Sequence, residues 1–502
     1  MVRWLLVGLV SALLLSGAAQ AQSRLPEGSP VRTLCIACHT PDETGRIPTI
    51  ESIRTTPEGW RRIVDRMNRN YKLDLDEEYA AEIVADLANS LALSPAEMAD
   101  LEGYLRTRAL PTDDPALPET FARSCASCHG YEVIASQRRT EAAWMRLEGF
   151  HRGYFPIIPM IYRDLDWPTA AQAALTALTA RFPFETDWTP GEPVTGEFLV
   201  AGHQAGKGQY TGRRTVAEDG STYTETLTFE DGTTVEGSGQ GQVTAGYHWR
   251  FEGATRSLVG SATPEGWFDF RWQGPLGATG SERAVAANQP GLLAVSPEAI
   301  VTEGGEVTVT LYRSGSGKEV KSSLPVAGVE ESGPALKVKL KVPRLTRPQE
   351  VKLSLADTPG EVTLKLAPRV DGIRISPEDP AARIGGGKIP LVPLQFEARA
   401  LSFGADGKPN TDDDISLGLV QPTWSLEDYA GTDMADDPSY IGTLDASGLF
   451  APATLAPNPE RVRRNNTGDA WVVARYRPTG ALKTYRARVL LKVVVPEYRG
   501  NV

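Results

Sequence analysis

Two copies of a Cys-x-x-Cys-His motif are the residues of this chain best suited to chemistry. Their members are Cys35, Cys38 and His39 in the first copy, and Cys125, Cys128 and His129 in the second. At this spacing two thiols can add to the vinyl groups of a haem, and the adjoining imidazole can bind the iron. The two copies use all four cysteines of the chain. We therefore predict two covalently bound haem c groups, each with its histidine as proximal ligand.

Three other interpretations of closely spaced cysteines compete with haem attachment: a redox disulfide, a zinc site and a chance match. A zinc site tolerates other spacings, and it does not require a histidine directly after the second cysteine in both copies. The repeated histidine favours haem.

An internal repeat suggests the sixth iron ligands. Residues 52–63 and 136–147 share Ser, Arg, Thr, Trp and Arg at a constant offset of 84 positions. The same offset places Met67 opposite His151, each seven positions after the tryptophan of its repeat. We predict Met67 as sixth ligand of the first haem and His151 as that of the second. A methionine thioether raises the potential of a haem and a second histidine lowers it, so the two haems would form a downhill relay.

Each predicted sixth ligand has an alternative. A methionine on a helix is more often a core residue than a ligand. Met98 is the other methionine of the first haem unit, but it lies on the apolar face of a later predicted helix. His151 competes with Met160, which belongs to a loop stiffened by two prolines, a setting that also presents methionine ligands. The sequence favours His151 and leaves Met160 open.

Short helices are expected to position these ligands, and β-structure follows them. Residues 24–185 show helical periodicity, including the run 77–87 and a capping box from Ser94 to Glu97. From about residue 189 the chain becomes rich in Thr, Tyr, Val and Trp, with tight-turn pairs at 219–220, 231–232 and 252–253. The strands predicted there are 197–200, 208–215, 222–229, 233–237, 246–251 and 267–272.

The predicted fold class is multidomain α plus all-β. A helical dihaem cytochrome c domain precedes an antiparallel β-barrel-like domain and two immunoglobulin-like β-sandwiches. The predicted boundaries are a signal peptide at 1–21, the haem domain at 22–186 with haem units at about 24–110 and 111–186, the barrel at 187–288, and the sandwiches at 289–368 and 369–502.

Charge and the N-terminal segment predict the compartment. The formal charge of −11 argues against binding to nucleic acid or an anionic membrane surface. Arg3, an apolar run over residues 4–15 and the small residues around Ala21 have the pattern of a secretory signal cleaved near Ala21. No later segment has the roughly 18 uninterrupted apolar residues of a spanning helix. We expect a periplasmic protein without a membrane span in the mature chain.

The order of these features resembles one known family. Two haem motifs behind a signal peptide, followed by barrel-like and sandwich-like domains, are similar to the large, dihaem alpha subunit of quinohaemoprotein amine dehydrogenase. The resemblance covers essentially the whole mature chain and rests mainly on domain order. It implies that a primary amine is oxidised at a cysteine tryptophylquinone in a small crosslinked subunit, beside a β-propeller subunit. The two haems then pass electrons to a soluble cytochrome c or blue copper protein.

The cysteine count adds a constraint to this resemblance. Because every cysteine is assigned to haem, a cysteine-derived quinone must come from another chain. The chain is therefore expected to be the haem subunit of an oxidoreductase acting on primary amines, with no catalytic residue of its own. The alternatives are a free-standing dihaem electron carrier and a dihaem c-type peroxidase, which needs one haem with an open or displaceable sixth position.

Overall fold

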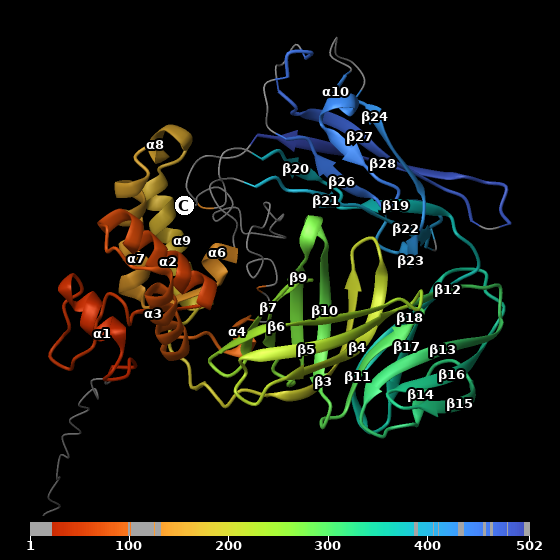
Figure 1. Cartoon of the computed structure of the whole chain (residues 1–502), viewed down its shortest axis with the longest axis horizontal. Coiled ribbons are helices and arrows are strands. Elements are labelled where there is room, and N and C mark those ends of the chain that lie inside the picture. The colour runs from red at the N-terminus through yellow and green to blue at the C-terminus, as the bar shows by residue number, and fades with distance from the viewer. Residues whose placement is uncertain are drawn as a thin grey trace, which may run out of the picture. The chain divides into compact units, whose positions relative to one another are not determined.

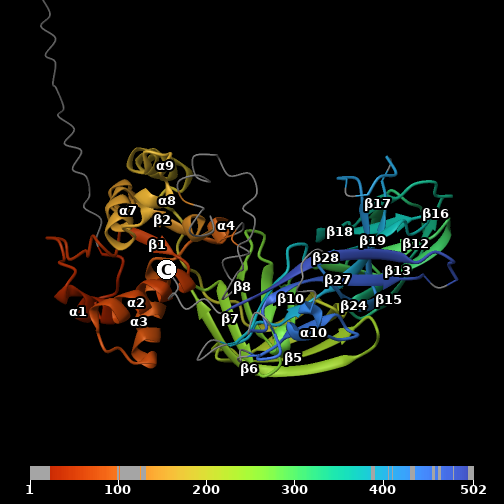
Figure 2. The same ribbon diagram turned by 90° about the horizontal axis from the view of Figure 1, so that it is seen from above.

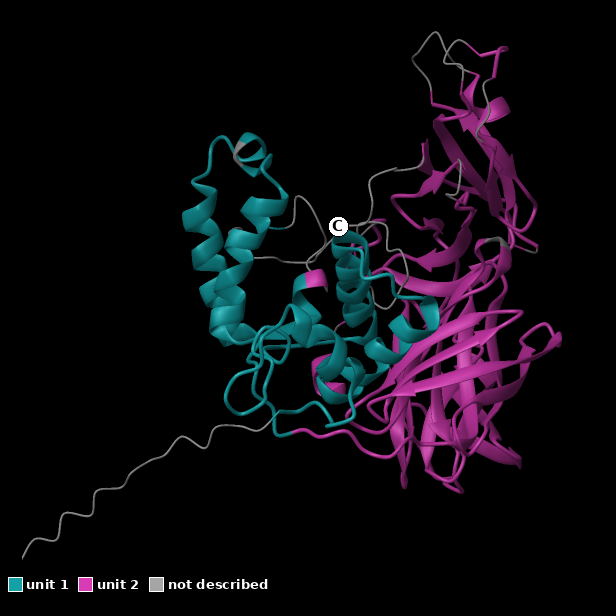
Figure 3. Cartoon of the chain, turned by 60° about the vertical axis from the view of Figure 1, so that its left-hand side comes forward, with its two compact units in different colours: residues 1–93, 116–128, 134–187 teal, residues 94–115, 129–133, 188–502 magenta. Residues whose placement is uncertain are grey.

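The computed structural model describes residues 23–98, 101, 125, 132–385, 390–404, 406–409, 411–429, 436–454, 458–461, 465–478 and 480–495. The chain divides into two compact units (Figure 3). Unit 1 comprises residues 1–93, 116–128 and 134–187, and unit 2 comprises 94–115, 129–133 and 188–502. The predicted signal peptide, Cys128 and His129 lie outside the described residues.

Unit 1 is built mainly from helices. They are α1 (Pro30–Leu34), the 3₁₀ turn η1 (Cys35–Ala37), α2 (Pro57–Tyr71), α3 (Glu77–Ser90), α7 (Glu141–Tyr154), α8 (Ile158–Ile161) and α9 (Trp167–Arg181). The short helix α6 (Glu132–Ala135) lies across the unit boundary. Helix α2 packs against α3, and α7 packs against α9 (Figure 2). Two short strands, β1 (Ile53–Thr55) and β2 (Gln137–Arg139), pair antiparallel between these helices.

Helices α2 and α7 begin in the same way, as the repeat predicts. The hydroxyl of Thr56 accepts a hydrogen bond from the Gly59 amide at 3.1 Å, and that of Thr140 accepts one from Ala143 at 3.3 Å. Such N-caps satisfy amides that the first helical turn leaves unpaired. Trp60 and Trp144, four positions after the two caps, are each only 1% exposed. The repeat is therefore structural, and it holds both helices that carry the predicted sixth ligands.

Unit 2 contains a closed eight-stranded antiparallel barrel (Figure 1). Its strands are β3 (Gly196–Gln204), β4 (Gly208–Val216), β5 (Thr222–Phe229), β6 (Thr234–Thr244), β7 (His248–Gly253), β8 (Ser257–Ala262), β9 (Phe268–Gln273) and β10 (Thr279–Ala286). Each strand pairs with the next, and β10 closes on β3. The predicted barrel is confirmed, although strands β8 and β10 were not predicted.

Two of the three predicted turns are correct and one is displaced. Gly220 and Gly232 have φ of +73° and +83°, the left-handed conformation that tight hairpins require. Gly253 is instead the last residue of β7. An unpredicted turn contains Gly246 at φ +75°, so β7 begins at His248 and not at Gly246. His248 is buried in this strand beside the Ser261 hydroxyl at 2.7 Å.

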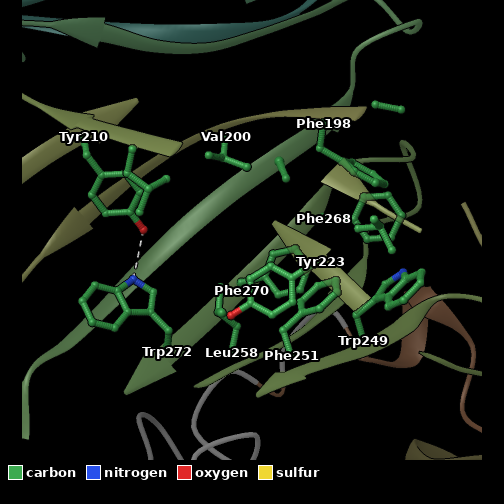
Figure 4. Packing of buried hydrophobic residues seen from close by; sticks show 14 of the residues in the cluster. Phe198, Val200, Tyr210, Tyr223, Trp249, Phe251, Leu258, Phe268, Phe270 and Trp272 are labelled. Carbon is green, nitrogen blue, oxygen red and sulfur yellow. Dashed lines mark hydrogen bonds between the residues drawn. The ribbon is translucent and has the colours of Figure 1, made fainter. Parts of the chain in front are cut away.

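The barrel interior combines aromatic packing with a buried ion network. Figure 4 shows the aromatic cluster, in which the Trp272 indole donates to the Tyr210 hydroxyl at 3.0 Å. The network consists of two arginines and two glutamates whose side chains are at most 4% exposed: Arg214, Arg256, Glu225 and Glu282. Each arginine contacts both glutamates, at 2.6–2.8 Å. Two positive and two negative charges cancel, which makes their burial tolerable.

Two further β regions follow the barrel. The first has two four-stranded sheets that share one apolar core. Its strands are β11 (Gly291–Ser296), β12 (Ala299–Val301), β13 (Gly305–Ser314), β14 (Val320–Ser322), β15 (Val326–Ser332), β16 (Ala335–Val342), β17 (Gln349–Leu355) and β18 (Thr358–Ala367). The sheet orders are β11-β13-β16-β15 and β12-β18-β17-β14.

The C-terminal region contains three small sheets of orders β19-β22-β23, β20-β28-β27-β24 and β21-β26-β25. Its elements are β19 (Gly372–Ser376), β20 (Ala381–Arg383), β21 (Leu394–Gln395), β22 (Glu397–Ser402), β23 (Ile415–Val420), β24 (Thr423–Asp428), α10 (Asp437–Tyr440), β25 (Gly442–Leu444), β26 (Leu449–Pro452), β27 (Gly468–Tyr476) and β28 (Tyr485–Val494). The structure is thus multidomain and mostly β. The immunoglobulin-like class and the domain boundaries stay predictions. Among the described helices, none is long and apolar enough to cross a membrane.

Candidate haem sites

The first Cys-x-x-Cys-His motif forms one compact turn. Residues 35–37 form η1 directly after α1, and the amides of Cys38 and His39 both donate to the carbonyl of Cys35, at 3.1 and 2.8 Å. The two thiols and the imidazole therefore come from the same turn of backbone. Cys35 and Cys38 are free thiols in the structure. This is the local geometry that attachment of one haem through two thioethers and one histidine needs.

Thr49 holds the ring of His39. The Nδ1 atom of His39 lies 2.8 Å from the Thr49 hydroxyl. With the hydroxyl accepting, Nε2 carries the lone pair that an iron ligand must supply, and the ring orientation is fixed by the hydrogen bond. Burial lowers the pKa of the His39 imidazole below its ordinary value, which favours the neutral form. Sequence reasoning missed Thr49, since nothing in its spacing from His39 marks it.

The electrostatics of Cys35 do not fit a redox-active thiolate. Burial, and then the charge of Cys38, raises the pKa of the Cys35 thiol above its ordinary value. Reactive cysteines in Cys-x-x-Cys motifs have the opposite shift, because a nearby positive charge or helix N-terminus stabilises the thiolate. Within the described residues, no group of three or more His, Cys, Asp or Glu side chains could hold a metal ion by itself. The environment of Cys35 therefore differs from that of a reactive redox cysteine.

Met67 continues the inward face of α2. Trp60, Val64 and Met67 follow the spacing of one helical stripe, and Trp60 and Val64 belong to the apolar core against which Cys35 packs. Met67 itself is half-buried, one turn beyond Val64. Its role as sixth ligand stays a prediction. The alternative Met98 is buried in unit 2, on helix α4 (Pro95–Met98), which contacts β8.

The second site is described in part. Cys125 is half-buried, whereas Cys128 and His129 lie outside the described residues. His151 is half-buried on α7, with ring centroids of Phe155 and Trp167 at 6.1 and 6.2 Å. Its Nδ1 lies 2.7 Å from the Leu147 carbonyl, which can only accept, so Nδ1 carries the hydrogen and Nε2 the lone pair. The tautomer of His151 is thus the one that iron ligation through Nε2 requires.

Met160 has a different environment from His151. It lies on α8 and is 62% exposed. The remaining two described histidines are engaged elsewhere, since His203 contacts Glu397 at 2.5 Å and His248 contacts Ser261. Among the candidates of the second unit, His151 has the more constrained side chain. The ligand choice itself stays a prediction.

Comparison with known proteins identifies the family. Three family models match the chain, and all three describe one protein. The haem-binding model of the quinohaemoprotein amine dehydrogenase alpha subunit matches residues 29–188, which contain both Cys-x-x-Cys-His motifs. Alpha subunit domain II matches residues 191–258, and alpha subunit domain IV matches residues 373–501. The chain belongs to the alpha subunit family of quinohaemoprotein amine dehydrogenases.

This membership confirms the family resemblance seen in the sequence, and it confirms that the chain is a haem-binding subunit of an amine dehydrogenase, an oxidoreductase. Quinohaemoprotein amine dehydrogenases have several subunits, so the alpha subunit has partners. No curated protein matches the chain significantly.

Several solved structures match parts of this alpha subunit. A redesigned β-barrel is 14% identical over 18% of this chain and 89% of that chain, with a TM-score of 0.16. The titin domains Z1Z2 in complex with telethonin are 14% identical over 42% and 94%, with a TM-score of 0.14. Drosophila N-cadherin EC1-3 is 8% identical over 54% and 86%, with a TM-score of 0.21. None of these likenesses bears on function.

Proposed function

We propose that this chain is the dihaem electron-transfer subunit of a periplasmic quinohaemoprotein amine dehydrogenase. The observation that carries the proposal is the haem-binding family model over residues 29–188, because that range contains two Cys-x-x-Cys-His motifs and no further cysteine. Two motifs of this kind support two covalently attached haem c groups. When bound, each haem supplies one-electron transfer between its ferric and ferrous states.

The residues of the chain hold and tune those haems. The four cysteines serve as thioether anchors, and His39 and His129 serve as proximal ligands. Met67 is proposed as the sixth ligand of the first haem and His151 as that of the second, with Met160 as the alternative to His151. Thr49 and the Leu147 carbonyl orient the imidazoles of His39 and His151 through their Nδ1 atoms. The unlike ligand sets would give the haems different potentials, which suits a relay.

Amine oxidation is assigned to another chain. All four cysteines are needed for haem, so a cysteine tryptophylquinone belongs to a small partner subunit, with a β-propeller subunit completing a heterotrimer. Electrons from that quinone would enter this chain and leave to a soluble cytochrome c or blue copper protein. The net charge of −11 favours a basic or neutral carrier, since an acidic surface attracts a basic partner over distance.

Affinity purification from the native host tests this assignment. Under the proposal, a tagged chain isolated from the periplasmic fraction brings with it a small subunit that stains for quinone and a larger subunit without haem. A free-standing dihaem carrier or a dihaem peroxidase would come alone. Purification of the chain by itself, with two haems and no quinone-staining companion, would contradict the proposed assembly.

A further inference from the structure

Arg139 is buried in unit 1 with a charge that no described carboxylate balances. It lies on β2 and is 9% exposed. Its Nε and Nη2 donate to the side-chain oxygen of Gln137 at 2.9 and 2.6 Å, and its guanidinium lies 5.7 Å from the centre of the Trp144 ring. An amide oxygen and an aromatic face solvate a guanidinium in part, but neither carries a negative charge.

Arg66 lies in a similar environment on helix α2. It directly precedes Met67 on α2, and its guanidinium lies 5.0 Å from the centre of the Phe150 ring, which directly precedes His151 on α7. Its Nε is buried and has no hydrogen-bond acceptor among the described residues. A buried donor without an acceptor destabilises the folded state, and more so when it is charged. The site therefore lacks an acceptor.

A third arginine makes this a cluster. Arg146, an exposed residue of α7, donates to the Ser52 hydroxyl at 3.3 Å. Burial, and then the charges of Arg66 and Arg146, lowers the pKa of Arg139 to about 9. We call Arg66, Arg139 and Arg146 the arginine cluster. Among the described side chains, no carboxylate lies within ion-pair distance of any of the three.

Some other buried arginines in the described part of the chain pair with carboxylates, whereas others donate to backbone carbonyls. In the barrel, Arg214 and Arg256 each contact two glutamates. In the C-terminal region, Arg461 is 2% exposed and pairs with Asp436 and Asp437. The chain has 63 acidic residues against 52 lysines and arginines, so carboxylates are not scarce. A cluster without them, in the unit that binds haem, points to an anion that is not a side chain.

We propose that the arginine cluster binds propionate carboxylates of a bound haem, with Arg66 and Arg139 as the main donors. The inference rests on the proposed haem function. A haem carries two propionates, and the planar guanidinium fork matches a carboxylate in a bidentate manner. Neutralising propionate charge near the iron removes an electrostatic preference for the ferric state. The cluster therefore raises the reduction potential of the haem whose propionates it holds.

Substitutions that keep or remove the charge test this role. We would prepare Arg139→Gln, Arg66→Gln and Arg139→Lys, with Arg61→Gln as the matched control. Arg61 lies on α2 with Arg66, but it already pairs with Asp65 at 2.8 Å and Glu77 at 2.6 Å on the surface. Each holoprotein is measured by spectroelectrochemical titration and by resonance Raman spectroscopy of the propionate modes. Haem content is determined first. A wild-type protein that carries only one haem would contradict the proposed function and not this inference.

The proposal predicts one pattern. Arg139→Gln and Arg66→Gln both lower the potential of the same haem and shift its propionate bands, Arg139→Lys recovers part of the potential, and Arg61→Gln changes neither readout. The proposal is wrong if both glutamine variants bind two haems, show the wild-type potentials for both and have unshifted propionate bands. Should Arg139→Gln fail to fold, the half-buried Arg66 carries the test by itself, and an unchanged Arg66→Gln protein would overturn the assignment.

Discussion

Arg54 and Arg138 lie directly opposite each other in the two-stranded ribbon of β1 and β2, and they are the same position of the two sequence repeats, 84 residues apart. Ile53 and Thr55 pair symmetrically with Arg139 and Gln137 around them. A local two-fold relation thus passes through the arginine pair.

Both arginines are buried and donate to backbone carbonyls. Arg54 donates to the carbonyls of Phe184 and Ala92. Arg138 donates to those of Ala135 and Gln137. The ribbon joins the repeats that carry Met67 and His151.

Haem attachment should divide between the two motifs. Replacing Cys35 and Cys38 together by alanine should leave one covalent haem, and replacing Cys125 and Cys128 should do the same, because each thioether needs a cysteine sulfur. Haem staining of a denaturing gel together with a pigment assay gives the haem count per chain. Two covalent haems in either double variant would contradict the assignment of the motifs.

The sixth ligands should be distinguishable by their absorption spectra. Met67→Ala should abolish the weak near-infrared band that arises from sulfur-to-iron ligation, whereas His151→Ala should leave that band and perturb only the other haem. The reason is that the repeat assigns a thioether to one iron and an imidazole to the other. If His151→Ala leaves the absorption spectrum unchanged and Met160→Ala changes it, the sixth ligand of the second haem is Met160 and not His151.

Thr49 should tune the first haem alone. Its hydroxyl accepts from His39 Nδ1 and makes the imidazole a stronger electron donor, which stabilises ferric iron. Thr49→Val should therefore raise the midpoint potential of the first haem in a spectroelectrochemical titration and leave the second haem unchanged. Thr49→Ser, which keeps the hydroxyl, serves as the control. A lowered or unchanged potential in the valine variant would show that the hydrogen bond does not act on the iron.

The ion network of the barrel should make its stability depend on pH. Burial by itself would raise the pKa of Glu225, but the hydrogen bond from Arg256 and the charges of Arg214 and Arg256 lower it to about 2. A carboxyl whose pKa is lowered on folding contributes stability above its ordinary pKa of 4.5, and that contribution is lost as the pH falls from there toward 2. Glu225→Gln should therefore destabilise the barrel by about 3–5 kcal/mol at neutral pH, and by less at pH values near 3.

Hydrogen exchange of the β4 and β5 amides gives the free energy of barrel opening for this comparison. Glu197→Gln is the control, since Glu197 pairs with Arg213 on the barrel surface and should cost at most about 1 kcal/mol. The free energy of barrel opening should differ less between wild type and Glu225→Gln as the pH falls. A difference that stays constant or increases in acid would contradict the ionised state of Glu225.

The sequence predicted the features that are local in the chain. Residue type and spacing marked both haem motifs, and a constant offset marked the repeat. Asp-Gly pairs marked two barrel hairpins because Gly220 and Gly232 adopt the left-handed conformation that favours glycine. Strand β8 was missed because four consecutive residues of it are buried, which hides the alternation expected of a half-buried strand.

Features that depend on distant neighbours were not predictable. The pairing of Arg54 with Arg138 joins strands 84 residues apart, and no local pattern encodes it. The missing counter-charge of Arg139 is a property of its surroundings, which include Arg66 from helix α2. The burial of His248 likewise follows from the register of β7 on β8, where it pairs with Ser261.

Amine-dependent haem reduction by the purified chain tests the central proposal most directly. With every cysteine assigned to haem, the isolated chain should be reduced by a chemical reductant, yet a primary amine should leave its haem spectrum unchanged. Adding the quinone-bearing partner subunit should restore reduction of the haems by the amine. Reduction of the haems by a primary amine in a sample verified to contain this chain alone would contradict the account and place the amine-oxidising site within these 502 residues.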